Sequence, residues 1–381
     1  MSDRLNLSCN PPAESLDFLH DRLYVVRTLV PNGYEAYFRK RAQYRSVQTS
    51  TAIEGNELGE EQAMLVLVED TQAASADELE LKNLDEAYDL VRQIAGDQSV
   101  RIDEGLVRTM NSVMLKDLPT AEARSRGRYR VGSSLVVNSH SRAIRYRPPP
   151  PARVPNLMAN FVSDIQGWMH ERTYPGPIIA ALAHFGLISI HPFEDGNGRT
   201  ARLLADMILH QTGWSNEGMV SVSEAILRRQ QDYYDTLYET QGENFRQEVD
   251  ATPFVRFHAE VLSQAAADLE RTVISFNRRL QAFVERAASV LNPRQALALM
   301  FMLDVAPLST SAFADLAGAS QSSALADLTQ MVQLGFVERV GGGRNTRYRV
   351  HDVLRQDAAA REAEVEASAG EAAMAANTES G

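Results

Sequence analysis

Residues 191–202 read His-Pro-Phe-Glu-Asp-Gly-Asn-Gly-Arg-Thr-Ala-Arg, and this stretch decides the fold and chemistry expected of the chain. His191 is the type of side chain that accepts a proton near neutral pH. Asp195 offers the hard oxygen that Mg²⁺ prefers beside phosphates. The turn Gly196-Asn197-Gly198 feeds a helix, whose backbone N–H groups and positive end attract phosphate. These parts predict the transfer of a phosphate-bearing group to a hydroxyl.

Two arginines complete the pattern. Arg199 and Arg202 are three residues apart, so both can point from one side of a helix toward a triphosphate. The alternative is a glycine-rich loop beside a core histidine and two surface arginines. The number of specified residue types in fixed order disfavours that alternative.

Composition bounds the class of protein. The 381 residues suffice for two or three domains, and 44% hydrophobic with 23% charged residues is ordinary for a globular chain. A single cysteine, Cys9, excludes an internal disulfide framework. We find no secretory signal and no apolar run of membrane-spanning length, so we expect a cytoplasmic protein that does not enter the membrane. The net charge of −12 disfavours nucleic-acid binding.

Periodic apolar residues predict a mostly helical chain. β-forming residues between Gly127 and Pro151 interrupt it and predict a short β-hairpin within 131–147. The helices are expected at 16–30, 34–51, 63–68, 79–94, 102–115, 155–171, 177–190, 197–212 and 224–240, with a helical run at 253–290 that breaks near its middle.

A separate C-terminal unit is expected at 293–352. Helices at 296–303, 310–316 and 322–334 precede a hairpin at 336–340 and 348–350, and a helix-turn-helix followed by such a wing resembles a winged-helix domain. No lysine or arginine lies between Gln295 and Glu338. DNA affinity depends on cation–phosphate contacts, so we expect a protein-interaction or dimerisation module and do not expect DNA binding. The basic residues cluster around the wing: Arg339, Arg344, Arg347 and Arg349.

The stretch 191–202 resembles the signature of Fic-domain proteins, His-Pro-Phe-x-Asp-Gly-Asn-Gly-Arg-x-x-Arg, at every specified position. The resemblance implies a mainly α fold, with a helical Fic core, a short β-hairpin flap, an N-terminal helical region and a C-terminal winged-helix domain. It implies a protein adenylyltransferase, which moves AMP from ATP to Ser, Thr or Tyr hydroxyls of a target protein or of itself. The expected parts are an N-terminal helical region at 1–95 with an inhibitory helix near 44–56, a Fic core at 96–262, a helical linker at 263–292, the winged helix at 293–352 and an acidic disordered tail at 353–381.

The resemblance also assigns roles. His191 takes the proton of the attacking hydroxyl, and Asp195 holds Mg²⁺. Gly198 separates the chain from the phosphorylating Doc branch, which carries lysine there. The remaining expected contacts are the phosphate ligands Gly196, Asn197 (through its backbone and its amide), Gly198, Arg199 and Arg202; the flap residues Leu135, Val136, Val137 and Asn138; and the adenine-side residues Tyr233, Tyr234 and Gln241. The flap would align the target by β-augmentation. The tyrosines could equally be amphipathic core.

The segment Ser50–Asn56 closes an expected helix. Ser50 and Glu54 are four residues apart and share a helix face. Alone this is a weak pattern, consistent with an ordinary helix end. Beside the Fic motif it resembles the inhibitory helix of some Fic proteins, in which the glutamate pairs with the second motif arginine, here Arg202. A second hypothesis lets Glu54 activate a water that removes AMP from a modified target.

The sequence is also compatible with two other functions. One is a winged-helix transcriptional regulator whose Fic core only senses nucleotide. Another is a Fic enzyme that uses a different nucleotide donor, such as UTP. A homodimer is compatible with the sequence, which does not name the target.

Overall fold

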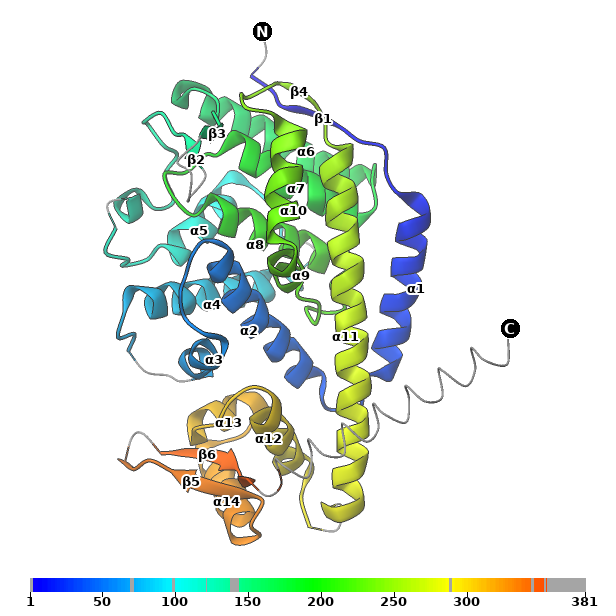
Figure 1. The fold of residues 1–381 in the computed structure, drawn as a ribbon, viewed down its shortest axis with the longest axis vertical. Helices are drawn as coiled ribbons and strands as arrows, with labels where there is room; N and C mark the ends of the chain where they lie inside the picture. The colour runs from blue at the N-terminus through cyan, green and yellow to red at the C-terminus, as the bar shows by residue number, and fades with distance from the viewer. Residues whose placement is uncertain are drawn as a thin grey trace. The chain divides into compact units, whose positions relative to one another are not determined.

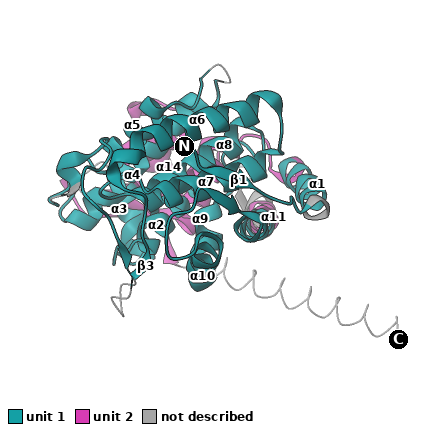
Figure 2. Ribbon diagram, turned by 90° about the horizontal axis from the view of Figure 1, so that it is seen from above, with its two compact units in different colours: residues 1–27, 41–67, 72–269 teal, residues 28–40, 68–71, 270–381 magenta. Residues whose placement is uncertain are grey.

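The computed structural model describes residues 3–68, 72–97, 100–120, 122–137, 144–287, 290–343, 346–352 and 354. Contacts divide the chain into two compact units (Figure 2): residues 1–27, 41–67 and 72–269 form unit 1, and residues 28–40, 68–71 and 270–381 form unit 2. Helices dominate both units (Figure 1), which confirms the mainly α fold. Residues 1–27 and 41–67 lie in the same unit as the expected core, whereas residues 28–40 belong to unit 2.

The first half of the chain follows the predicted helical pattern. Polar N-caps define several starts; Ser75, for example, accepts a hydrogen bond from Glu78 N at the beginning of α4. The elements are β1 (Asn6–Ser8), α1 (Ala13–Leu29), α2 (Glu35–Ile53), α3 (Glu60–Val68), α4 (Ala76–Ala95), α5 (Glu104–Met114), η1 (Glu122–Ser125), β2 (Val136–Val137), β3 (Ile144–Tyr146), η2 (Pro151–Arg153) and α6 (Val154–Glu171).

The core of unit 1 is built on α7 (Gly176–Ile190), which packs extensively on α8 (Asn197–Gln211). Every residue of α7 is buried, as expected of a helix that is apolar on all sides. Gly186 of α7 faces Phe161 of α6 so closely that a Cβ atom would overlap the ring. The central helices therefore pack tightly directly beneath the loop that carries residues 191–196.

Two helical expectations were wrong. The helix predicted at 224–240 is two helices, α9 (Val222–Arg228) and α10 (Gln230–Gln241), separated at Arg229, where φ is −119°. The break expected within 253–290 does not occur, because α11 (Thr252–Ala287) is continuous. No proline or glycine interrupts its sequence after Pro253, so nothing disrupts the hydrogen bonds of the helix.

One sheet was not predicted. β1 pairs in parallel with β4 (Glu248–Asp250), with Leu7 opposite Val249. Parallel strands so distant in sequence leave no local signal, and each has only three residues. The predicted hairpin is present as β2 paired antiparallel with β3.

Unit 2 contains the predicted helix-turn-helix and wing. An aromatic cluster of Tyr37, Phe38, Phe276 and Phe301 packs within this unit. Gly318, with φ +58°, makes the turn between the second and third C-terminal helices. The elements are α12 (Pro293–Asp304), α13 (Thr310–Ala317), α14 (Gln321–Gln333), and the antiparallel strands β5 (Val337–Val340) and β6 (Arg347–Val350).

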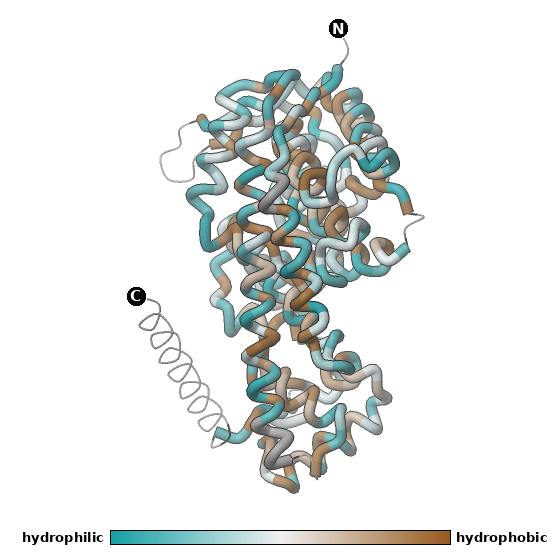
Figure 3. The backbone as a smooth tube through the Cα atoms, turned by 90° about the vertical axis from the view of Figure 1, so that its right-hand side faces the viewer, coloured by the Kyte–Doolittle hydropathy of each residue, from teal (hydrophilic) through white to brown (hydrophobic). Residues whose placement is uncertain are grey.

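Hydrophilic and hydrophobic residues alternate along the helices (Figure 3), which is the pattern of amphipathic helices packed on one side. Within the described residues, none of the helices combines the length and the apolar character needed to cross a membrane. The acidic tail expected at 353–381 lies almost wholly outside the described residues.

Candidate active site

The loop between α7 and α8 is closed by a side chain. Asn197 Oδ1 accepts a hydrogen bond from Phe193 N at 2.9 Å, and Asn197 Nδ2 donates to Phe193 O at 2.9 Å. The amide that we expected to contact phosphate is therefore engaged inside the loop. Gly196, with φ +78°, turns the chain into α8. The loop that begins at His191 therefore leads directly into the N-terminus of α8, an end of a helix that favours anions.

His191 ends α7 in the left-handed region, with φ +50°. Its Nδ1 atom is buried. Burial and the nearby Arg130 guanidinium lower the pKa of His191 to about 4, although a hydrogen bond with the backbone of Ile188 and the charges of Glu54 and Asp195 act in the opposite direction. The ring is therefore neutral at pH 7 and able to accept a proton.

Asp195 is the exposed carboxylate of the loop, with 38% of its side chain accessible. It accepts hydrogen bonds from Gly196 N at 2.5 Å and from Arg199 Nη2 at 3.1 Å. Its backbone carbonyl accepts a hydrogen bond from Asn111 Nδ2 at 2.9 Å. Among the described residues, no group of three or more His, Cys, Asp or Glu side chains could hold a metal. Asp195 suits Mg²⁺ only if phosphates and water supply the other ligands, which is the usual arrangement for this ion.

Arg202 contacts the segment that was predicted to inhibit the active site. Its Nη2 donates to Glu54 Oε1 at 2.6 Å and to Ser50 O at 3.0 Å, and its Nε donates to Ser50 Oγ at 2.8 Å. The pairing expected from the sequence is therefore present. Burial opposes ionisation of Glu54, yet Arg202 and Arg199 hold its pKa below the ordinary value. Its carboxylate lies so close to Gly198 that a Cβ atom there would overlap it.

Arg199 is also paired with carboxylates. It forms an ion pair with Glu80 of α4 in addition to its contact with Asp195, and only 5% of its side chain is exposed. Glu80 Oε2 accepts a further hydrogen bond from Asn56 Nδ2 at 2.7 Å. Both motif arginines nevertheless keep a buried nitrogen without a partner in the described residues, Arg199 Nε and Arg202 Nη1. Such unsatisfied donors favour an anionic ligand.

The expected flap lies beside the motif. Leu135 is 52% exposed and Val137 is 40% exposed, so the hairpin presents apolar side chains to solvent, while Val136 pairs with Tyr146. Asn138 lies outside the described residues. On the other side of the hairpin, Tyr146 donates from its hydroxyl to Ser189 O at 2.6 Å, which attaches the flap to α7.

The three residues expected near adenine differ in how exposed their side chains are. Tyr233 is 1% exposed, and its hydroxyl lies 3.0 Å from His184 Nε2, so its ring presents no open face to a base here. Gln241 is buried, with Oε1 3.4 Å from Ser189 Oγ. Tyr234 is 43% exposed and donates to Ile53 O at 3.0 Å, directly before Glu54. Only Tyr234 retains the exposure that a stacking contact needs.

Four residues that support the site were not predicted from the sequence. Arg130 binds the main chain of His191, Glu80 binds Arg199, and Gln230 shares the Ile53 carbonyl with Tyr234 at 3.1 Å. The fourth, Asn111, supports the loop. Arg130 and Glu80 carry no local signal, because their partners are far away along the chain.

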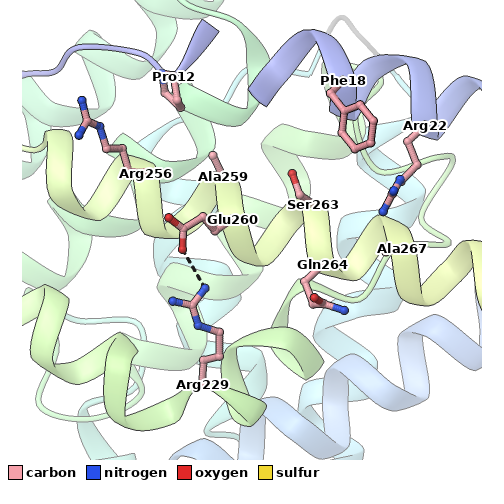
Figure 4. A pocket seen from close by; sticks show the side chains of 10 residues that line it. All are labelled: Pro12, Phe18, Arg22, Arg229, Arg256, Ala259, Glu260, Ser263, Gln264 and Ala267. Atoms are coloured by element: carbon pink, nitrogen blue, oxygen red, sulfur yellow. Dashed lines mark hydrogen bonds and ion pairs between the residues drawn. The ribbon is translucent and has the colours of Figure 1, made fainter. Parts of the chain in front are cut away.

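An open pocket of about 960 Å³ lies elsewhere in unit 1, between α1, α11 and Arg229 at the junction of α9 and α10 (Figure 4). Phe18 and Arg22 project into it from α1, and Arg229 forms an ion pair with Glu260 at 2.9 Å. None of the residues 191–202 lines this pocket. We assign it no part in the chemistry.

Comparisons with known proteins agree with this site. Residues 101–209 match the Fic/DOC family, and residues 293–351 match the family described as transcriptional regulator DIP2311-like, C-terminal domain. The protein adenylyltransferase Fic of Nematostella vectensis is 32% identical over 228 residues, which are 58% of this chain and 47% of that protein. The Drosophila melanogaster protein of that name is 27% identical over 295 residues, which are 74% and 54% of the two chains. The chain thus spans about half the length of the curated relatives it matches.

Solved structures show the same fold. A Fic family protein from Desulfovibrio desulfuricans aligns with a TM-score of 0.53 and 23% identity, covering 90% of this chain and 98% of that one. A Fic domain containing signaling protein from Bacteroides thetaiotaomicron aligns with a TM-score of 0.57 and 21% identity, covering 68% and 97%. The fold and the motif loop define a Fic-type helical core. Residues 101–209 are the part of the chain that matches the Fic/DOC family.

Proposed function

We propose that this protein is an adenylyltransferase, which transfers AMP from ATP to a hydroxyl side chain of a protein. The observation that carries the proposal is the arrangement of residues 191–202, with a neutral histidine beside a helix N-terminus, an exposed carboxylate and two buried arginines. The curated relatives named protein adenylyltransferase support it. ATP is the proposed donor, Mg²⁺ is the proposed metal, and the target is another protein or the chain itself.

In the proposed reaction, the hydroxyl oxygen bonds to the α-phosphorus of ATP. The bond from that phosphorus to the bridging oxygen of the β-phosphate breaks, and pyrophosphate leaves. The proton of the hydroxyl passes to a ring nitrogen of His191, which is neutral because burial and Arg130 lower its pKa. Holding the two reactants in line supplies much of the acceleration in such transfers.

The phosphates would lie at the N-terminus of α8. The backbone N–H groups of Asn197 and Gly198 would meet the phosphates there. Gly196 N, which donates to Asp195 Oδ1 in this structure, would join them only after leaving that contact. The unpartnered donors of Arg199 and Arg202 would bind phosphate oxygens. Asp195 would hold Mg²⁺, which neutralises phosphate charge when bound.

We further propose that Glu54 holds the enzyme in a low-activity state. Its carboxylate lies against Gly198 and pairs with Arg202, the positions that the distal phosphates would use. A carboxylate and a phosphate compete for the same donors. ATP would bind productively only after Glu54 has moved away. Removal of AMP through a water activated by Glu54 stays a hypothesis from the sequence.

The flap suits an extended target segment. Leu135, Val136 and Val137 would line the nucleotide and target edge of the hairpin, and an added strand gains main-chain hydrogen bonds with little sequence demand. Tyr234 is the exposed candidate for a contact with adenine. The cytoplasmic location and the homodimer stay predictions.

Intact mass spectrometry tests the proposal. Purified Glu54→Gly protein is incubated with ATP and Mg²⁺, in parallel with UTP, alone and with a lysate of its host. We expect a gain of one AMP moiety on the protein or on a target, which His191→Ala abolishes. No gain from ATP in any sample would contradict the proposal, and a gain only from UTP would identify another nucleotide donor.

A nucleotide-responsive transcriptional regulator is the second candidate, and the match of residues 293–351 favours it. The charges oppose it: within α14 the only charged side chain is Asp327, which is buried and pairs with Arg294. Salt-dependent binding of the full chain to duplex DNA, altered by ATP, would support this candidate.

A further inference from the structure

Arg130, outside the motif, makes an unusual set of contacts with it. Its side chain is buried, with 2% exposed, and donates to three backbone carbonyls: His191 at 2.7 Å, Gly132 at 3.0 Å and Pro149 at 2.5 Å. No described carboxylate forms an ion pair with this guanidinium. Burying a cation without a counter-charge costs free energy. The buried position of Arg130 therefore indicates a role that depends on its contacts with the backbone.

The first of these contacts fixes His191. A left-handed conformation costs a non-glycine residue about 1 kcal/mol, and His191 adopts it with φ +50°. Its N–H donates to Leu187 O at 2.8 Å, and its carbonyl receives Arg130 Nε. The next carbonyl, that of Pro192, accepts from Arg130 N at 2.9 Å. The main chain that carries the ring is therefore held on both sides.

The other two contacts fix the hairpin. Gly132 precedes β2 and Pro149 follows β3, so one guanidinium binds both ends of the flap and the histidine together. We propose that Arg130 is a positioning residue, which places a target segment on the flap at the correct distance from the His191 ring. The inference rests on the proposed function, because it names what the flap and His191 must share. A displacement of 1 Å can cost roughly 100-fold in rate.

The charge of Arg130 has a separate effect. The charged groups that face His191 are Arg130 from the segment before β2, Glu54 from the turn that follows α2, and Asp195 from its own loop. Arg130 acts with burial to lower the pKa of His191, and the two carboxylates raise it. Loss of the positive charge should raise the pKa of His191. Lysine keeps the charge but lacks the planar fork that reaches three carbonyls.

The test uses the full chain with Glu54→Gly as parent. Arg130→Lys and Arg130→Met are compared with Arg128→Lys, an exposed arginine two residues earlier. Thermal melts and ATP titration check folding and binding. We expect both Arg130 variants to transfer AMP at least 10-fold more slowly, with ATP affinity within about twofold, and the control to match its parent. NMR titration of ¹³C-labelled histidine, assigned with His191→Ala, should show a raised pKa of His191 in Arg130→Met only.

A rate in Arg130→Lys equal to that of the control would overturn the proposal, as would a rate loss explained wholly by weaker ATP binding. If Arg130→Met does not fold, Arg130→Lys alone decides through its rate and its unshifted titration. A parent that transfers nothing would count against the proposed function itself. In that case the titration of His191 still judges the contact: an unchanged pKa in a folded Arg130→Met variant rejects it.

Discussion

Replacing Glu54 should release the activity of the site by an amount that the contact predicts. The Glu54 Oε1 to Arg202 Nη2 distance is 2.6 Å, and 2% of the arginine side chain but 33% of the glutamate side chain is exposed. A hydrogen bond between charged groups contributes about 1.5–3 kcal/mol, and partial exposure favours the lower part of that range. About 2 kcal/mol corresponds to roughly 30-fold. We expect Glu54→Gly to raise self-modification about 30-fold.

A graded series makes this prediction sharper. Glu54→Gln keeps an acceptor for Arg202 but loses the charge, and a neutral hydrogen bond is worth about 1 kcal/mol. The glutamine variant should therefore lie between wild type and glycine, at about fivefold. Glu57→Gln is the matched control, because Glu57 is exposed. The assay is the initial rate of labelled AMP incorporation at saturating ATP. Equal rates for wild type and Glu54→Gly would refute the reasoning, and so would a glutamine variant as slow as the control.

Three further predictions concern stability. Glu80→Gln leaves the buried Arg199 short of a counter-charge and should lower the free energy of unfolding by about 2–3 kcal/mol in urea titrations, an effect that an unchanged midpoint would contradict. Burial lowers the pKa of His258 from 6.5 to about 4. Between these pH values the unfolded chain binds a proton at His258 and the native state does not. The free energy of unfolding therefore falls by about 3 kcal/mol as the pH drops from 6.5 to 4. Melting temperatures of wild type and His258→Gln should therefore converge or cross in this window, and parallel curves would reject the assignment. Gly186→Ala adds a methyl group against a buried ring and should cost about 1–3 kcal/mol, whereas Gly167→Ala, with nothing within 4 Å, should stabilise α6 by about 0.5–1 kcal/mol in the same urea assay.

Local chemistry was predictable from the sequence where the residues lie close together. The stretch 191–202 carries the loop, the helix start and the arginines in fixed order, and periodicity located most of the helices. The contact between Glu54 and Arg202 was also expected, through the resemblance of Ser50–Asn56 to an inhibitory helix. It is present in the structure.

What could not be predicted depends on contacts between distant segments. Glu80 and Arg130 lie far from their partners in sequence, and a single sequence holds no signal for such pairs. Tyr233 shows the limit of periodicity: the pattern fits a helix with an aromatic side chain, but only the packing of α10 shows that this ring is buried. The turn at Arg229 was missed because apolar spacing continues across it.

In the proposed reaction His191 directs AMP, which carries the α-phosphate of ATP, to a hydroxyl, while Glu54 restrains the site. Incubating Glu54→Gly protein in parallel with ATP labelled at the α-phosphate and ATP labelled at the γ-phosphate tests it most directly. We expect label on protein from the α-position only, reduced in wild type and absent in Glu54→Gly/His191→Ala. Label from the γ-position, or α-label that survives the loss of His191, would contradict it.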